Sequence, residues 1–190
     1  MKIKALVGTI ILTTSTSGLP QGVLDQSFLP VEPNVYYDNF SGNSIGQTFT
    51  VGLTGTLTEV DVWIARNEPL PDGDVSWTLT VGGSGTLLAS GTIAYASLSF
   101  EYAFQSCVVP PGTVNVNAGD ILAITLSSSH RFTWPGSSAN LYPDGAEISH
   151  PFSDVGFRDF VIPVPEPHSL AIIWMGTILM LWKRQRDGLV

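Results

Sequence analysis

The feature that most constrains the fold of this chain is a two-residue alternation of apolar and polar side chains in its central part. A period of two places apolar side chains on one face of an extended strand and polar ones on the other. Two stretches show it clearly, with apolar residues at Val75, Trp77, Leu79 and Val81 in the first and at Leu122, Ile124 and Leu126 in the second. The alternation predicts half-buried β-strands.

Other strand-like runs have turn-forming clusters between them. Residues 67–74 and 109–120 are rich in Pro, Gly, Asn and Asp, and no helical pattern of about ten residues appears before the C-terminal tail. Short strands at such spacing are typical of an antiparallel β-sandwich. The further predicted strands lie within residues 47–53, 59–65, 86–93, 99–104 and 154–161.

The charge of the central segment limits its partners. Residues 25–162 hold fourteen acidic residues against three arginines and no lysine, a net charge of −11. Nucleic acid is excluded as a partner because phosphate binding requires clustered Lys or Arg. Cys107 is the only cysteine, so no internal disulfide can form. We therefore expect one domain over 25–162, stabilised by packing.

The C-terminal tail, residues 163–190, combines three elements in a fixed order. Alternate prolines precede an uncharged apolar run from Ser169 to Trp182, and a basic cluster follows it. A helix through this run has no polar face, so it suits a bilayer, with the basic cluster on the cytoplasmic side. The alternative is a buried core helix or an amphipathic partner helix, since the run is shorter than the roughly 20 residues that a span prefers. The flanking residues are Pro163, Pro165 and Pro167 before the run, and Lys183, Arg184 and Arg186 after it.

With Pro165-Glu166-Pro167 at its start, this tail resembles the PEP-CTERM sorting signal of bacterial surface proteins. The resemblance covers the last 28 residues or so and implies recognition of the motif by a membrane processing enzyme, an exosortase, in organisms that make exopolysaccharide. His168 stands where the family usually has a small hydroxyl residue, and the span is rich in Trp and Met rather than Gly and Leu.

The N-terminal segment, residues 1–24, has the pattern of a secretory signal peptide. Lys2 and Lys4 precede an eight-residue apolar stretch from Ala5 to Leu12, and small polar residues follow. The alternative is an ordinary first strand, because the apolar stretch is short for a signal peptide. A sorting signal at one end requires export, and a signal peptide at the other end would provide it.

The central segment itself resembles a jelly-roll surface domain that recurs in bacterial proteins with interchangeable anchors. The resemblance covers nearly all of residues 24–162 and implies a fold like that of non-catalytic carbohydrate-binding modules, without implying an activity. The stretches that carry it are LDQS, GQTFTVGLTGTLTEVDVWIAR, VNVNAGDILAITLSSS and FRDFV.

Catalytic motifs are weakly represented. Gly42, Ser44 and Gly46 fit the G-x-S-x-G pattern, but a nucleophile elbow needs a helix after the serine, and the following residues alternate as a strand. A triad would need His130 or His150 beside Ser44, with a carboxylate that orients the imidazole. We therefore predict that the protein is not an enzyme, and keep a secreted hydrolase of matrix polysaccharide as the alternative.

The loop around residues 131–145 offers a candidate glycan site. An exposed aromatic ring stacks on the C–H face of a sugar, and nearby polar groups accept bonds from its hydroxyls. The candidate residues are Trp134, Asn140, Tyr142 and Asp144. The alternative is that Trp134 plugs one end of the sandwich, as large aromatics are usually buried. Trp63 either faces outward or fills a second layer.

Acidic residues near both ends of the domain offer a candidate metal site. By resemblance, jelly-roll modules often hold a structural calcium where the first and last parts of the domain meet, which points to Asp25, Asp154 and Asp159, with Glu32 and Asp144 nearby in sequence. The alternative is solvated surface acids, because no calcium loop of regular spacing is present.

The sequence therefore predicts an exported β-sandwich that reaches the cell surface or extracellular matrix through a processed C-terminal anchor. The expected partners are an exosortase-type enzyme, the membrane at least transiently, and exopolysaccharide. The expected role is structural or adhesive, with glycan binding as its most specific form.

Overall fold

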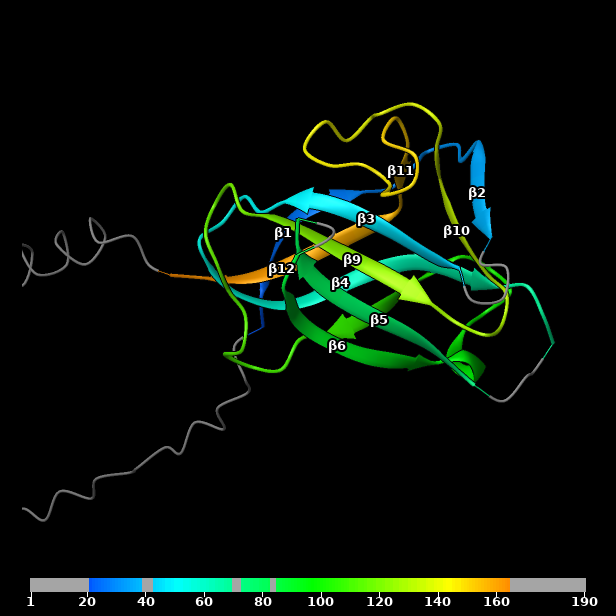
Figure 1. The fold of residues 1–190 in the computed structure, drawn as a ribbon, viewed down its shortest axis with the longest axis horizontal. Coiled ribbons are helices and arrows are strands. Elements are labelled where there is room, and N and C mark those ends of the chain that lie inside the picture. Colours follow the sequence, from blue (N-terminus) through cyan, green and yellow to red (C-terminus); the bar gives the residue numbers. More distant parts are fainter. Residues whose placement is uncertain (1–20, 39–42, 70–72, 83–84, 165–190) are drawn as a thin grey trace, which may run out of the picture.

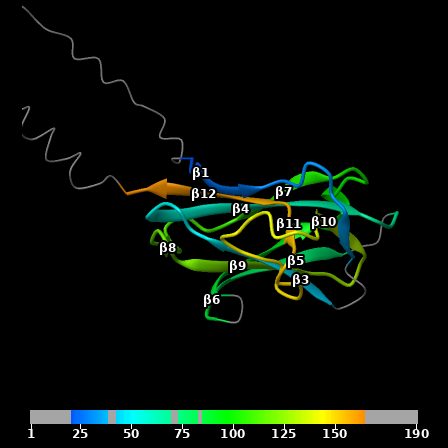
Figure 2. The ribbon, with the colours of Figure 1, turned by 90° about the horizontal axis from the view of Figure 1, so that it is seen from above.

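The structure, a computed structural model, describes residues 21–38, 43–69, 73–82 and 85–164, which form two antiparallel sheets. The sheets lie face to face as two layers (Figures 1 and 2). An all-β fold with antiparallel sheets, consistent with a β-sandwich, is therefore confirmed. The predicted processing signals, including Pro165, Glu166, Pro167, Lys183, Arg184 and Arg186, lie outside the described residues.

The larger sheet has eight strands in the order β1-β12-β4-β10-β11, with β2 beside β10 and both β7 and β8 beside β4. The smaller sheet has four strands in the order β3-β9-β5-β6. The strands of the larger sheet are β1 (Val23–Phe28), β2 (Val35–Asp38), β4 (Gly55–Arg66), β7 (Ala103–Val108), β8 (Asn115–Val116), β10 (Phe132–Ser137), β11 (Asp154–Val155) and β12 (Phe157–Pro163). Those of the smaller sheet are β3 (Ser44–Thr50), β5 (Asp74–Val81), β6 (Leu87–Ala94) and β9 (Ile121–Ser127), and a short 3₁₀ turn covers Tyr95–Ser97.

The core lies between the two layers and follows the predicted alternation. Val62 and Ile64 of β4 and Leu79 of β5 are fully buried, as are Leu122, Ile124 and Leu126 of β9. Val81 departs from the alternation and is 45% exposed. Val81 is the last residue of β5, and it follows the point where the register with β6 shifts, between Leu79 opposite Ala89 and Thr80 opposite Leu87.

The strand predicted over residues 99–104 is wrong in extent, because β7 begins only at Ala103. Phe100 and Tyr102 are instead exposed, at 57% and 36%. The Ser99 hydroxyl accepts a hydrogen bond from the backbone amide of Glu101 at 3.0 Å. Such local side-chain bonds favour a turn over a strand ladder.

Strand β10 lies in a stretch that was predicted to be a loop because of Pro135 and its Gly and Ser neighbours. Pro135 pairs with Tyr36 of β2. On its other side, the partner of β10 changes from β4, opposite Phe132 and Thr133, to β11, opposite Gly136 and Ser137. Proline is tolerated at such a change of partner because no ladder amide is needed there.

The two ends of the described domain lie side by side. Val23 near the start of β1 pairs with Val161 of β12, and Pro163 pairs with Gly55 at the first residue of β4 (Figure 1). Strand β1 begins at Val23 and β12 ends at Pro163. In the part of the chain that the structure describes, no helix is long and apolar enough to cross a membrane.

Candidate functional site

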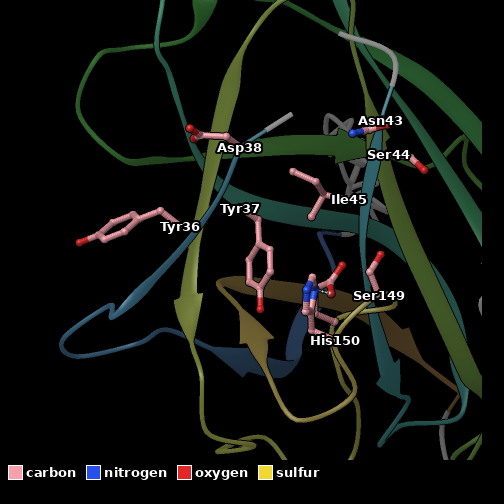
Figure 3. A pocket seen from close by; sticks show the side chains of 9 residues that line it. Tyr36, Tyr37, Asp38, Asn43, Ser44, Ile45, Ser149 and His150 are labelled. Carbon is pink, nitrogen blue, oxygen red and sulfur yellow. Dashed lines mark hydrogen bonds and ion pairs between the residues drawn. The ribbon is translucent and has the colours of Figure 1, made fainter. Parts of the chain in front are cut away.

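A cleft of about 610 Å³ opens where β2 and the start of β3 meet the loop before β11 (Figure 3). This volume is within the range of small-molecule sites, roughly 300–1,000 Å³. The described part of the lining is mostly polar and contains neither Lys nor Arg. Its residues are Tyr36, Tyr37, Asp38, Asn43, Ser44, Ile45, Glu147, Ser149 and His150.

A buried carboxylate orients an exposed imidazole in this cleft. Nδ1 of His150 lies 2.8 Å from Oε2 of Glu147. The side chain of His150 is 60% exposed, whereas that of Glu147 is 1% exposed. Because Nδ1 is engaged, Nε2 is the ring nitrogen that remains for a ligand.

The loop that carries this pair is tied to the smaller sheet. The amide of Ile148 donates to the carbonyl of Gly46 at 2.8 Å, and the amide of Glu147 donates to the carbonyl of Ser153 at 2.7 Å. Glu147 also forms an isolated β-bridge with Gln47. Backbone bonds on both sides of Glu147 therefore fix its position before any ligand arrives.

Tyr37 provides the aromatic wall of the cleft. Its ring centroid lies 5.1 Å from that of His150, and its side chain points toward His150 (Figure 3). Burial raises the pKa of its phenol, as do the charges of Glu147 and Asp154, while a hydrogen bond with Ser153 lowers it. The phenol therefore stays neutral at physiological pH and can both donate and accept hydrogen bonds.

Asp38 forms the opposite rim and is already well bonded. Oδ2 of Asp38 lies 2.9 Å from Nη2 of Arg131, and Oδ1 accepts hydrogen bonds from Asn67 at 3.1 Å and from the hydroxyl of Thr133. Because Arg131 offsets the charge of Asp38, this carboxylate is a rigid part of the wall. The exposed imidazole and the tyrosine are more open to a ligand.

Ser44 lines the cleft but does not complete a catalytic triad. It is the first residue of β3, so a strand and not a helix follows it, as the alternation predicted. Figure 3 shows its hydroxyl pointing away from His150. The G-x-S-x-G pattern is therefore not a nucleophile elbow in this fold.

The predicted exposed aromatic plate at Trp134 is wrong, and the alternative that Trp134 fills the sandwich is right. Trp134 is fully buried, and its Nε1 donates to the carbonyl of Gly156 at 2.7 Å. Tyr142 is 7% exposed and packs edge-on against Phe157. Asn140 and Asp144 are exposed, but the aromatic rings predicted to accompany them, Trp134 and Tyr142, are buried.

The predicted calcium site does not assemble from Asp25, Asp154 and Asp159. Asp154 is fully buried, and its Oδ2 accepts bonds from the amides of Leu141 at 2.7 Å and Tyr142 at 2.8 Å. It thereby anchors the loop before β11. Across residues 21–38, 43–69, 73–82 and 85–164, no group of three or more His, Cys, Asp or Glu side chains is placed to hold a metal ion.

Asp25 and Asp159 do lie close together, across strands β1 and β12. Oδ2 of Asp25 accepts a bond from the amide of Gly52 at 2.7 Å, and Oδ1 of Asp159 accepts one from the amide of Gln26 at 2.9 Å. Among the residues that the structure describes, Oδ2 of the fully buried Asp159 has no hydrogen-bond partner. Burial and the charge of Asp25 raise the pKa of Asp159 to about 8, so this carboxyl is mainly protonated at neutral pH.

The cleft could not be predicted from the sequence because its residues come from three distant segments. A signal was nevertheless present, since Glu147 and His150 are three residues apart in a loop with no apolar alternation. No known family model matches the chain, and no curated protein is significantly similar to it. The geometry of the cleft and the sequence patterns therefore carry the functional argument.

Proposed function

We propose that this protein is an exported, non-catalytic surface or matrix protein whose β-sandwich binds glycan in the cleft of Figure 3. The finer fold that we propose is a jelly-roll like that of carbohydrate-binding modules. Export depends on residues 1–24, and sorting by an exosortase-type enzyme depends on Pro165-Glu166-Pro167 and the basic residues after the apolar run.

The observation that carries the proposal is the position of the cleft relative to the two described ends. Pro163 pairs with Gly55, the first residue of β4. Strand β10, which pairs with β2 beside the cleft, contacts β4 at its last two residues, Ala65 and Arg66. Because β4 has twelve residues, its first and last residues lie about 40 Å apart. A domain tethered through its tail would present the cleft away from the tether, which suits an adhesive role.

The chemistry of the cleft suits a ligand with many hydroxyl groups. Tyr37 offers a ring face and a neutral phenol, and His150 offers Nε2. Asn43 adds an amide at the rim. Such a set combines stacking with donors and acceptors, which is what a sugar ring requires.

Sorting is tested by the intact mass of the protein recovered from its native host. We expect a mass that lacks both the signal peptide and the tail beyond the Pro-Glu-Pro motif. Glu166→Ala should leave the tail in place, whereas Glu101→Ala, a change of an exposed acid in the domain, should not affect processing. A full-length wild-type chain in the cytoplasm would contradict the proposal.

Glycan binding is tested on an array of matrix polysaccharides, with His150→Ala and Tyr37→Phe as variants. Each removes hydrogen-bonding capacity from the cleft, so we expect His150→Ala to weaken binding about tenfold or more and Tyr37→Phe to weaken it less. Glu101→Gln is the control, since Glu101 is exposed and lies outside the cleft. Equal binding by all four proteins would reject the cleft as the site.

One observation favours the hydrolase alternative, namely the imidazole that a buried carboxylate orients. A histidine held through Nδ1 can act as a general base toward water at Nε2. If the protein were a hydrolase, His150→Ala and Glu147→Gln would abolish product release, and Ser44→Ala would not because its hydroxyl points away (Figure 3). Binding without product release by the wild type would support the non-catalytic proposal.

A further inference from the structure

The outer face of the larger sheet carries a row of aromatic side chains that begins at the rim of the cleft. We call Tyr36, Trp63, Tyr102 and Phe104 the aromatic track. Tyr36 is 54% exposed and Tyr102 is 36% exposed, while Trp63 and Phe104 are partly buried. Aromatic side chains are usually buried, so a row of them at the surface calls for an explanation.

The rings of the track lie close enough to act together. Tyr36 and Tyr102 are nearly parallel, with 24° between their planes and 6.1 Å between their centroids. Trp63 and Tyr102 have centroids 5.4 Å apart. Phe104 pairs with Trp63 across β4 and β7. These separations are comparable with the length of one sugar unit in a polysaccharide.

Neighbouring groups hold the track in place. Trp63 lies across Gly156, where an added Cβ would come within 2.9 Å of the Cβ of Trp63. Cζ of Arg158 lies 4.1 Å from the centroid of Phe104, and its Nε lies 2.6 Å from Oδ2 of Asp61. The rings are therefore preorganised.

The track is continuous with the cleft through β2. Successive residues of a strand point to opposite faces, and Figure 3 shows Tyr36 directed away from the cleft centre while Tyr37 points toward His150. Tyr36 lines the cleft and also stacks with Tyr102. A chain bound in the cleft could therefore extend over Tyr36 onto the outer face.

We propose that the aromatic track binds the continuation of a neutral, extended polysaccharide chain whose first units occupy the cleft. The inference rests on the proposed glycan-binding function and adds the ligand class, an internal stretch of a polymer rather than a terminal sugar. Rings at this spacing offer successive stacking positions. The charge of −11 over residues 25–162 disfavours polyanionic polysaccharides.

The test measures the affinity of the full chain in detergent micelles for β-1,4-linked glucan oligosaccharides, from the disaccharide to the hexasaccharide. We expect the affinity to rise about tenfold over this series. Tyr102→Ala should remove this rise and leave the disaccharide affinity unchanged. Tyr36→Ala changes both the cleft and the track, so it should weaken the binding of every oligosaccharide in the series. Phe152→Ala is the matched control, since Phe152 is 77% exposed and lies outside both the track and the cleft.

Several results would overturn the inference while the proposed function stands. These are a hexasaccharide that binds no tighter than the disaccharide, or track variants that match Phe152→Ala, while His150→Ala still weakens binding. Equal binding of polygalacturonate would overturn the neutral ligand class. Concentration-dependent self-association that Tyr102→Ala abolishes, without any change in sugar affinity, would assign the track to a second copy of the chain. Failure of every sugar to bind would instead reject the proposed function.

Discussion

Two regions of this domain bury carboxylates in different ways. Asp154, the first residue of β11, accepts two backbone amide bonds from the loop between β10 and β11, and within this loop Glu147 pairs with His150. At the β1–β12 edge, Asp159 keeps one oxygen without a partner and holds a proton. A buried acid can therefore organise a loop when its oxygens are hydrogen-bonded. When one of its oxygens has no partner, the acid instead makes the stability of the fold depend on pH.

The largest expected effect is at Asp154. Asp154→Ala would leave the buried amides of Leu141 and Tyr142 without acceptors, so we expect the free energy of unfolding to fall by about 3 kcal/mol or more. Asp144→Ala, at an exposed position of the same loop, should change it by less than about 0.5 kcal/mol. Chemical denaturation measures both, and equal losses would remove the distinction between bonded and solvated acids.

An intermediate effect is expected at Asp159, and it depends on pH. The folded state holds the proton up to about pH 8, whereas the unfolded chain releases it near pH 4. The free energy of unfolding should therefore fall as pH rises between these values and level off above pH 8.

Asp159→Asn mimics the protonated form and should remove this dependence. We expect the variant to resemble the wild type near pH 5 and to be more stable than the wild type near pH 8. Asp144→Asn should keep the wild-type slope, because Asp144 is exposed. Parallel pH profiles for the wild type and Asp159→Asn in urea denaturation would show that Asp159 is not protonated in the folded state.

The smallest effect is expected from calcium. Calcium takes about six to eight oxygen ligands, and the pair of Asp25 and Asp159 offers few oxygens that are not already bonded. We expect millimolar calcium to leave the melting temperature unchanged. A clear rise in melting temperature, lost in Asp159→Asn, would show that a cation rather than a proton balances this pair.

The strands that could be predicted from the sequence are those with one buried and one exposed face. Leu79 and Ile124 belong to such strands, and their alternation predicted the sandwich. Strand β10 has no exposed face, since all six of its residues are buried, and it contains a proline, so it gave no alternation. This is why Trp134 was placed in a loop.

The candidate site was harder to predict, for a related reason. The cleft depends on Tyr37, Glu147 and His150, and more than a hundred residues separate the first from the other two. Only the sheet register brings them together, since β2 pairs with β10 and the loop of Glu147 is bonded to β3. The prediction that the chain carries a sorting tail concerns residues 163–190 and stays a prediction.

The position of β12 has a mechanical consequence. This strand lies between β1 and β4 and ends at the side where the chain continues toward the tail. If the domain is anchored beyond Pro163 and holds a ligand in the cleft, as we propose, tension would act along β12. Its hydrogen bonds to both neighbours would then be loaded in shear rather than opened one after another. Such a geometry would let the domain resist flow while it holds a ligand.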